Sequence, residues 1–269
     1  MQVTVVVENF CTNRALRSEW GYSLFLEGEK TRLLLDTGSE SHAFVHNLKA
    51  LRINPKTIDH IVLSHGHFDH TAGLIDAMML APQAKRWAAR SISVPRWGDA
   101  DHKRLSGGGA FLASALTDPI DSWARVTDEV IAFMVPQNAR DPQFVNTKNL
   151  WEERSNGKIV PDTFADDLSL LVKGERGYSV ILGCAHAGLP NILRYAQETF
   201  GIASFDTVLG GTHLSAASDE DLPKWIEALK AFKVSRWRPN HCTGFRAAAA
   251  LAKVFDDVDW AGCGMRISL

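Results

Sequence analysis

The sequence lacks the features that usually mark secreted, membrane-spanning and nucleic-acid-binding proteins. Its 269 residues include 29 basic and 31 acidic side chains, a balance that argues against a broad phosphate-binding surface and against nucleic acid as a partner. No run approaches about 18 uninterrupted apolar residues, so we expect neither a membrane-spanning helix nor a membrane partner. The opening MQVTVVVENFC has no basic segment before a long apolar run, and we expect a first strand there, not a signal peptide.

Cysteine is scarce, and repeats are missing. The four cysteines are far apart in the sequence and form no CxxC pair: Cys11, Cys184, Cys242 and Cys263. In a chain of this size that pattern argues against a disulfide framework, and we expect reduced thiols in a cytoplasmic protein. No internal repeat or low-complexity tract is present, and 45% apolar residues are ordinary for a globular enzyme with a sizeable core.

Short β-rich runs begin the chain and return in its second half. QVTVVVEN, YSLFLEG and TRLLLDTG are the first three. From about residue 168, strand-like runs alternate with amphipathic helical patterns such as LPNILRYAQETFG, in which Gly201 is a predicted C-cap. A strand-rich first part and an alternating second part predict two sheets covered by helices.

The middle of the chain, about residues 90–165, breaks this regularity. It contains several prolines, three consecutive glycines at 107–109, three tryptophans and no sustained period. We interpret it as an insertion of loops and short elements that acts as a lid or binding loop. The alternative is a plain elaboration of the surface.

The most informative stretch is IVLSHGHFDHTAGL, residues 61–74. His65, His67, Asp69 and His70 fall within six positions, directly after an apolar run. Imidazole and carboxylate groups are ligands that suit zinc and similar ions. His65 and His67 point the same way in an extended turn, while Asp69 and His70 can face a second point as the chain turns into a helix. One short loop could therefore serve two adjacent metals; surface histidines or helix caps are the alternative.

A metal site needs further ligands, and three histidines are in matching places. His186, His213 and His241 each follow a strand-like run: SVILGCA, DTVLGGT and VSRWRPN. Strands that end at one edge would bring all three histidines to the first cluster. Four others lack this placement and are not predicted ligands: His42, His46, His60 and His102.

These motifs together resemble the metallo-β-lactamase superfamily. The resemblance rests on H-x-H-x-D-H after an apolar strand, on Asp36-Thr37-Gly38 upstream, and on GCAHAGLPNIL, GGTHL and HCTG downstream. The same stretches look like one subfamily, labelled dihydropterin-6-methyl-aminobenzene-phosphate synthase-like or metal-dependent hydrolase. Apart from the middle insertion the resemblance covers the whole chain. It implies an α/β (α+β) fold, a four-layer αββα sandwich formed by residues 1–269 as one domain, with the site at one edge between the sheets.

The resemblance also implies two sets of metal ligands: His65, His67 and His186 for the first metal, and Asp69, His70 and His241 for the second. Asp36 would orient a ligand histidine from behind. The implied cofactors are two divalent metals, in the first place Zn²⁺, with iron or manganese as alternatives. A metal-activated water would attack an ester, phosphoester or related bond of a small-molecule substrate, and Asp69 would hold that water.

One position departs from the superfamily pattern. Many members have a bridging aspartate in a Gly-Asp turn after the strand that FDTVL matches, whereas this chain has glycine at the matching place, Gly211. His213 points to the same side as Gly211 along a strand-like path. It could ligate the second metal, act on the substrate as a catalytic residue, or be structural. Cys184 and Cys242, beside ligand histidines, are interpreted as buried small apolar groups, with a ligand role as the lesser alternative.

Other functions compete with hydrolysis. Di-iron relatives usually carry glutamate where this chain has His67, which argues against a di-iron redox enzyme and leaves a mononuclear iron oxygenase as an alternative. The charge balance argues against a nuclease. A non-enzymatic metal-binding or ligand-sensing module is opposed by the intact ligand set. The sequence determines neither the substrate nor the oligomeric state, because a fold does not fix a substrate.

Overall fold

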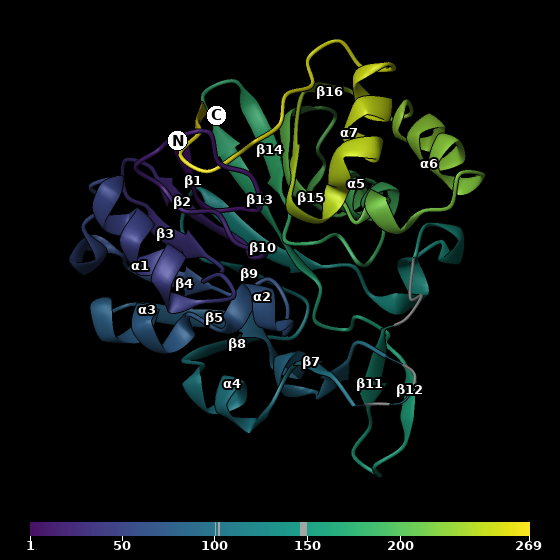
Figure 1. Cartoon of the computed structure of the whole chain (residues 1–269). Coiled ribbons are helices and arrows are strands. Elements are labelled where there is room, and N and C mark those ends of the chain that lie inside the picture. The colour runs from purple at the N-terminus through teal and green to yellow at the C-terminus, as the bar shows by residue number, and fades with distance from the viewer. Residues whose placement is uncertain (100, 102, 146–149) are drawn as a thin grey trace.

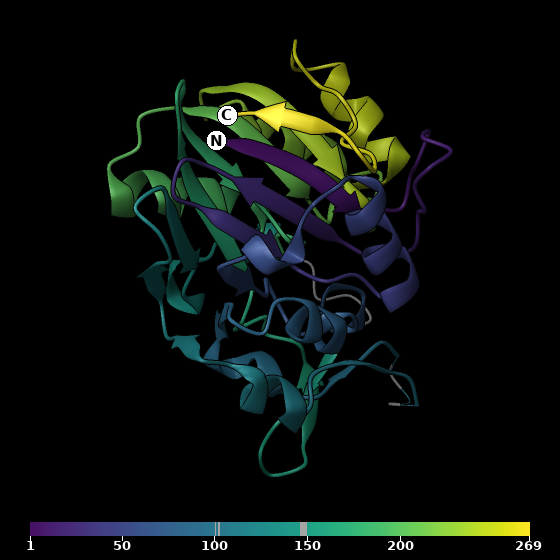
Figure 2. The ribbon, with the colours of Figure 1, turned by 90° about the vertical axis from the view of Figure 1, so that its left-hand side faces the viewer.

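The computed structural model describes residues 1–99, 101, 103–145 and 150–269. Two large β-sheets face each other, and helices cover the outer face of each (Figures 1 and 2). This is the αββα arrangement, so the predicted fold class is confirmed. In the described part of the chain, no helix is both long and apolar enough to cross a membrane.

The first sheet is built mainly from the N-terminal third of the chain. Its strands, in spatial order, are β17 (Arg266–Ser268), β1 (Gln2–Val7), β2 (Ser23–Glu27), β3 (Arg32–Leu35), β4 (His60–Val62), β5 (Lys85–Ala89) and β8 (Asp118–Ile120). In the described residues, four α-helices belong to this half: α1 (Ser41–Ala50), α2 (Phe68–Thr71), α3 (Leu74–Leu80) and α4 (Ala110–Ala115). Because β17 pairs with β1, the two chain ends lie side by side.

The second sheet contains the strands that the second half of the sequence predicts. Its spatial order is β16 (Val234–Asn240), β15 (Phe205–Gly211), β14 (Gly177–Ile181), β13 (Leu168–Gly174), β10 (Val130–Met134) and β9 (Trp123–Arg125). Its outer face is covered by α5 (Leu189–Phe200), α6 (Asp221–Leu229) and α7 (Gly244–Ala252). The predicted C-cap is confirmed, since Gly201 has the left-handed φ of 69° that ends α5.

Buried apolar side chains form three cores, one for each interface between layers. Successive residues of a strand point to opposite faces, and in β13 Leu170 and Val172 join the core between the sheets while Leu171 joins the core under α5–α7. The third core lies under α1 and α3 and includes Phe44 and Leu74. A strand that is buried on both faces reads as a continuous apolar run, as LSLLV does in the sequence.

The irregular middle segment is divided among all three sheets. β8 joins the first sheet, and β9 and β10 join the second. A small third sheet has the order β12 (Ile159–Pro161), β11 (Trp151–Glu153), β6 (Arg96–Trp97) and β7 (Leu105–Gly107). Strands of two or three residues are too short to show a period in the sequence. That this region acts as a lid stays a prediction.

The described residues also form short 3-10 helices: Pro55–Thr57, Arg90–Ser93, Gln137–Ala139, Pro142–Phe144, Leu214–Ala216 and His241–Thr243.

A buried charge cluster fastens the third sheet to the loop after β4. The guanidinium of Arg96 contacts Asp162 at 3.0 Å and Asp166 at 2.5 Å, and all three side chains are 0 or 1% exposed. Asp166 also accepts a hydrogen bond from the backbone N–H of Gly66 at 2.7 Å. Burial raises the pKa of Asp162 to about 7, against the opposing effect of Arg96. The cluster therefore holds the glycine between His65 and His67 through the side chain of Asp166.

Candidate metal centre

Four strand ends meet at one edge of the sandwich and carry the predicted site residues. β4 runs parallel to β3 and β5, and β14, β15 and β16 run parallel to one another. Parallel strands expose their carboxyl ends at the same edge, which is where the residues that follow them gather. The loop after β4 carries His65 and His67, and His186, His213 and His241 follow the other three strands. The structure thus brings together all seven predicted site residues: His65, His67, Asp69, His70, His186, His213 and His241.

His65, His67 and His186 form the first group. One ring nitrogen of each lies within 4.8 Å of the other two, and His65 Nε2 is 2.9 Å from His67 Nδ1. All three side chains are buried. His67 Nε2 and both ring nitrogens of His186 have no hydrogen-bond partner in the described part of the chain. Buried ring nitrogens without partners are costly, and a bound metal removes that cost at the nitrogens that ligate it.

Asp69, His70 and His241 form the second group. Nε2 of His70 and Nε2 of His241 are 3.2 Å apart, and Asp69 Oδ2 lies 3.3 Å from His241 Nε2 and 3.9 Å from His70 Nε2. Asp69 and His70 come from the single turn of α2, which starts directly after His67. The loop thus places Asp69 and His70 beside His241, and His65 and His67 beside His186. That each group holds one metal stays a prediction.

A second layer of hydrogen bonds orients these rings. Asp36 Oδ2 accepts a hydrogen bond from His70 Nδ1 at 2.7 Å, as the family resemblance implies for a residue that orients a ligand histidine. The backbone N–H of Ser64 donates to Asp36 Oδ1 at 2.7 Å, and Ser64 Oγ also lies 2.9 Å from His65 Nδ1. Asn9 Oδ1 is 2.9 Å from His241 Nδ1. Sequence reasoning missed Ser64 and Asn9; Ser64 adjoins the motif, but no spacing connects Asn9 with His241.

Electrostatics favour a cation in the second group. Burial alone would lower the pKa of His70, but the carboxylates of Asp36 and Asp69 raise it to about 9. Burial alone would raise the pKa of Asp69, but His70 and His241 hold it well below its usual range. The two carboxylates therefore stabilise a positive charge at this point, which a proton or a metal ion can supply.

The first group is built from neutral rings. Burial, together with the neighbouring histidines, lowers the pKa of His65 and of His186 well below the usual range. Burial and the nearby Arg96 lower the pKa of His67 to about 3. A neutral imidazole is the form that binds a metal ion. The donor set, the orphaned nitrogens and the charge balance thus fit two divalent metals.

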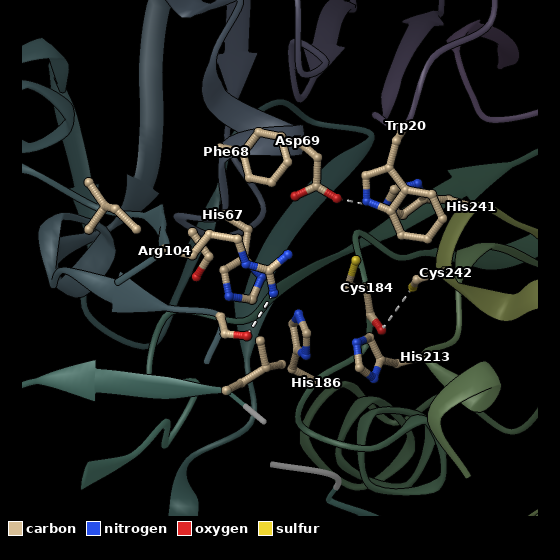
Figure 3. Close-up of a pocket in the computed structure, with 14 residues that line it drawn as sticks. Trp20, His67, Phe68, Asp69, Arg104, Cys184, His186, His213, His241 and Cys242 are labelled. Carbon is tan, nitrogen blue, oxygen red and sulfur yellow. Dashed lines mark hydrogen bonds and ion pairs between the residues drawn. The ribbon is translucent and has the colours of Figure 1, made fainter. Parts of the chain in front are cut away.

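A pocket of about 460 Å³ opens over both groups (Figure 3). Its floor carries ring and carboxylate atoms of the two groups, and its wall includes Trp20, Phe68, Arg104 and Leu105. Trp20 and Leu105 are each 58% exposed, so the rim presents apolar surface to solvent. Arg104 comes from the middle segment, which therefore contributes directly to the wall.

His213 lines this pocket beside the first group. Its ring centroid is 4.4 Å from that of His186, and its Nδ1 is buried without a hydrogen-bond partner in the described residues. In that part of the chain, none of the ligand groups within 4.8 Å includes His213. Burial and the nearby His241 lower its pKa to about 4, so the ring is neutral at pH 7. Among its predicted roles, this placement favours contact with the substrate.

The histidines outside the prediction also lie outside the site where the structure describes them. His42 and His46 are on α1, and His60 accepts a hydrogen bond from the Trp87 indole at 3.1 Å. His102 lies outside the described residues.

The fold and the site together define a class. The chain belongs to the metallo-beta-lactamase superfamily, whose family model matches residues 21–233. A relative from Methanocaldococcus jannaschii, named 7,8-dihydropterin-6-methyl-4-(beta-D-ribofuranosyl)-aminobenzene-5'-phosphate synthase, is 30% identical over 91% of this chain and 88% of its own length. An uncharacterized protein of the same organism is 27% identical over 94% of each chain.

Solved structures confirm the fold. The crystal structure of Tm1679, described as a metal-dependent hydrolase of the beta-lactamase superfamily, has a TM-score of 0.85 and 26% identity, covering 100% of this chain and 99% of the other. Zn(2+)-bound PqqB from Methylobacterium extorquens has a TM-score of 0.56 at 14% identity, covers 100% of both chains and shares the fold.

Proposed function

We propose that this chain is a metal-dependent hydrolase with two divalent metals, in the first place zinc, that acts on an ester, phosphoester or related bond of a small molecule. His65, His67 and His186 would hold one metal, and Asp69, His70 and His241 the other. The observation that supports this most strongly is the convergence of ring nitrogens from His65, His67 and His186 within 4.8 Å of one another, both of those of His186 being buried without a partner in the described residues. When bound, a pair of metals lowers the pKa of a water towards about 7 and polarises a substrate oxygen.

Asp69 would orient the attacking water. Its low pKa keeps it ionised at neutral pH, and it lines the pocket beside His241. An ionised carboxylate accepts a hydrogen bond from water and so fixes the direction of the lone pair that attacks. Because its pKa is so low, Asp69 is a weak base, and its contribution is to position the water.

His213 would contact the substrate as a neutral ring. With a pKa of about 4 it carries one N–H and one lone pair at pH 7, so it can donate a hydrogen bond to an oxygen on which charge develops. A neutral donor of this kind stabilises the transition state without delivering a proton.

Replacing His213 with alanine is expected to preserve metal binding and to lower kcat by about 10²–10³-fold, as loss of one oxyanion donor does. Metal content and steady-state kinetics on an identified substrate measure the two effects separately. His213→Gln, which keeps an N–H donor, should recover part of the activity. Unchanged kcat in His213→Ala would rule out the proposed contact, and loss of one metal would make His213 a ligand.

Metal quantification followed by a substrate screen tests the proposed function. Two zinc ions per chain are expected, with turnover that disappears on chelation and returns with zinc. The screen covers phosphodiesters, lactones, thioesters and phosphorylated pterins. One iron ion per chain would favour the oxygenase alternative instead.

A second candidate reaction comes from the 30% identical relative, which is named a synthase. In such a synthase the aminobenzene nitrogen would displace the phosphate of a phosphorylated dihydropterin, whereas in a hydrolase water would displace it. Adding an aminobenzene phosphate to the assays with phosphorylated pterins separates the two: a coupled product indicates synthesis, and release of the pterin alone indicates hydrolysis.

A further inference from the structure

The sulfur of Cys184 lies between the two groups of candidate ligands. Its Sγ is 3.2 Å from His70 Nε2, the ring nitrogen that belongs to the second group. It also lies within 4.8 Å of ligand atoms of His65 and, in a further set, of His241. The side chain is 3% exposed, and Figure 3 shows its sulfur pointing into the pocket. Among the described cysteines, only Cys184 and Cys242 belong to these groups of candidate ligands.

Two cysteines lie beside Gly211, the position of the missing aspartate. A Cβ built on Gly211 would lie 2.5 Å from the carbonyl oxygen of Gly183 and 2.6 Å from Cys242 Sγ, so even alanine at position 211 would force these atoms to shift. Cys242 Sγ is in turn 3.7 Å from the carbonyl oxygen of Cys184. The two cysteines therefore occupy the side of the site from which a side chain at position 211 would approach. Glycine at that position is explained by this packing.

The spacing of the atoms matches a coordination shell. Ligand atoms bound about 2.0–2.3 Å from one tetrahedral zinc lie about 3.3–3.8 Å from one another. The distances from His70 Nε2 are 3.2 Å to His241 Nε2 and 3.2 Å to Cys184 Sγ. Asp69 Oδ2 lies 3.3 Å from His241 Nε2 and 3.9 Å from His70 Nε2. Cys184 Sγ is therefore as close to His70 Nε2 as His241 Nε2 is, at a spacing compatible with two ligands of one zinc.

We propose that Cys184 Sγ is the fourth ligand of the second metal, on the side that faces the first, in place of the bridging aspartate that this chain lacks. The proposal rests on the proposed function, because it needs metal at Asp69, His70 and His241. Binding breaks the S–H bond; the proton leaves to solvent and the electron pair of sulfur forms the bond to the metal.

A thiolate changes which metals the site selects. Soft sulfur ligands favour zinc and cobalt over magnesium or manganese, which prefer oxygen. The second site is therefore expected to discriminate more strongly against manganese than an all-oxygen-and-nitrogen site would.

Cobalt spectroscopy tests the proposal with readouts other than activity. The protein is loaded with two equivalents of Co²⁺, and the near-ultraviolet band that arises from charge transfer between thiolate and cobalt is recorded. The wild type and Cys242→Ser should show the band, and Cys184→Ser should lose it while retaining the visible bands of bound cobalt. A band that persists in Cys184→Ser, or that disappears in Cys242→Ser alone, overturns the assignment.

X-ray absorption at the zinc edge of the wild-type protein needs no variant. One sulfur scatterer at about 2.3 Å for every two zinc ions supports the proposal, and a shell of nitrogen and oxygen alone overturns it. Two bound metals without a sulfur ligand would contradict only the assignment of Cys184 and would leave the proposed hydrolase function unaffected. A wild-type protein that binds no metal would contradict both.

Discussion

His67→Ala is expected to weaken metal binding by more than about 100-fold and to leave no turnover above background. Loss of a residue that merely orients a ligand costs 10–100-fold in affinity, and His67 is placed to be a ligand itself. Its Nδ1 is 2.9 Å from His65 Nε2, and its Nε2 has no hydrogen-bond partner in the described residues. Metal content after dialysis and competition with a chromophoric chelator give the affinity.

His42→Ala is the matched control for this variant. His42 has an exposed side chain on α1, and it takes no part in either ligand group. Its removal should leave metal content and turnover as in the wild type. Full occupancy of both metal sites in His67→Ala would contradict the assignment of His65, His67 and His186 as ligands of one metal.

Arg96→Leu is expected to lower the free energy of unfolding at pH 8 by about 3–5 kcal/mol, the usual cost of removing one partner from a buried ion pair. Asp162 and Asp166 share this one guanidinium, and with leucine both carboxylates would face an apolar side chain. Urea unfolding followed by circular dichroism measures the change. Arg90→Leu is the control: its partner Asp121 is 73% exposed, and no measurable change is expected.

The loss in Arg96→Leu should shrink as the pH falls. In the wild type the pKa of Asp162 is already raised to about 7 by burial, well above the value near 4 of an unfolded aspartate. The native state then binds the proton more tightly than the unfolded state does, so protonation stabilises it and stability is lost as the pH rises through the folded pKa. Without the positive charge of Arg96, the pKa of both carboxyl groups should rise further, and protonation should stabilise the native state more. A loss that is equal at pH 5 and pH 8 would contradict the shared-charge explanation.

The same variant connects the middle segment with the metal loop. Asp166 accepts the hydrogen bond of Gly66 N–H, and Gly108 N–H donates to Gly66 O at 2.7 Å. Both contacts hold the glycine that sets the spacing of His65 and His67. Arg96→Leu should therefore also weaken metal binding under conditions in which the protein remains folded.

Short-range features of the site could be predicted because few bonds separate the residues. His65, His67, Asp69 and His70 are fixed relative to one another by one turn of backbone, so their spacing alone predicted two groups that point to different places. Asp36 entered through the family resemblance, and its bond to His70 is present. The ligand roles of these residues stay predictions until metal is measured.

Long-range partners left no trace in local spacing. Asn9 meets His241 across 232 positions of the chain, and Asp166 meets Gly66 across 100. No periodic pattern in the sequence predicts the short strands of the middle segment or the burial of Arg96. Both depend on which sheet edge the segment pairs with in the folded chain.

In the sequence by itself, apolar periodicity predicted two sheets covered by helices, residue spacing predicted the cluster after β4, and the motifs carried the resemblance that implied the family and the αββα fold. Only the tertiary structure decided which strand ends share an edge, and so which distant side chains close the site. Cys184 is the clearest case: in sequence it is a small apolar residue near a histidine, and in space its sulfur is 3.2 Å from His70 Nε2. The reason is geometric, because a ligand shell is a property of three-dimensional distances, and these arise only when parallel strands from two sheets converge.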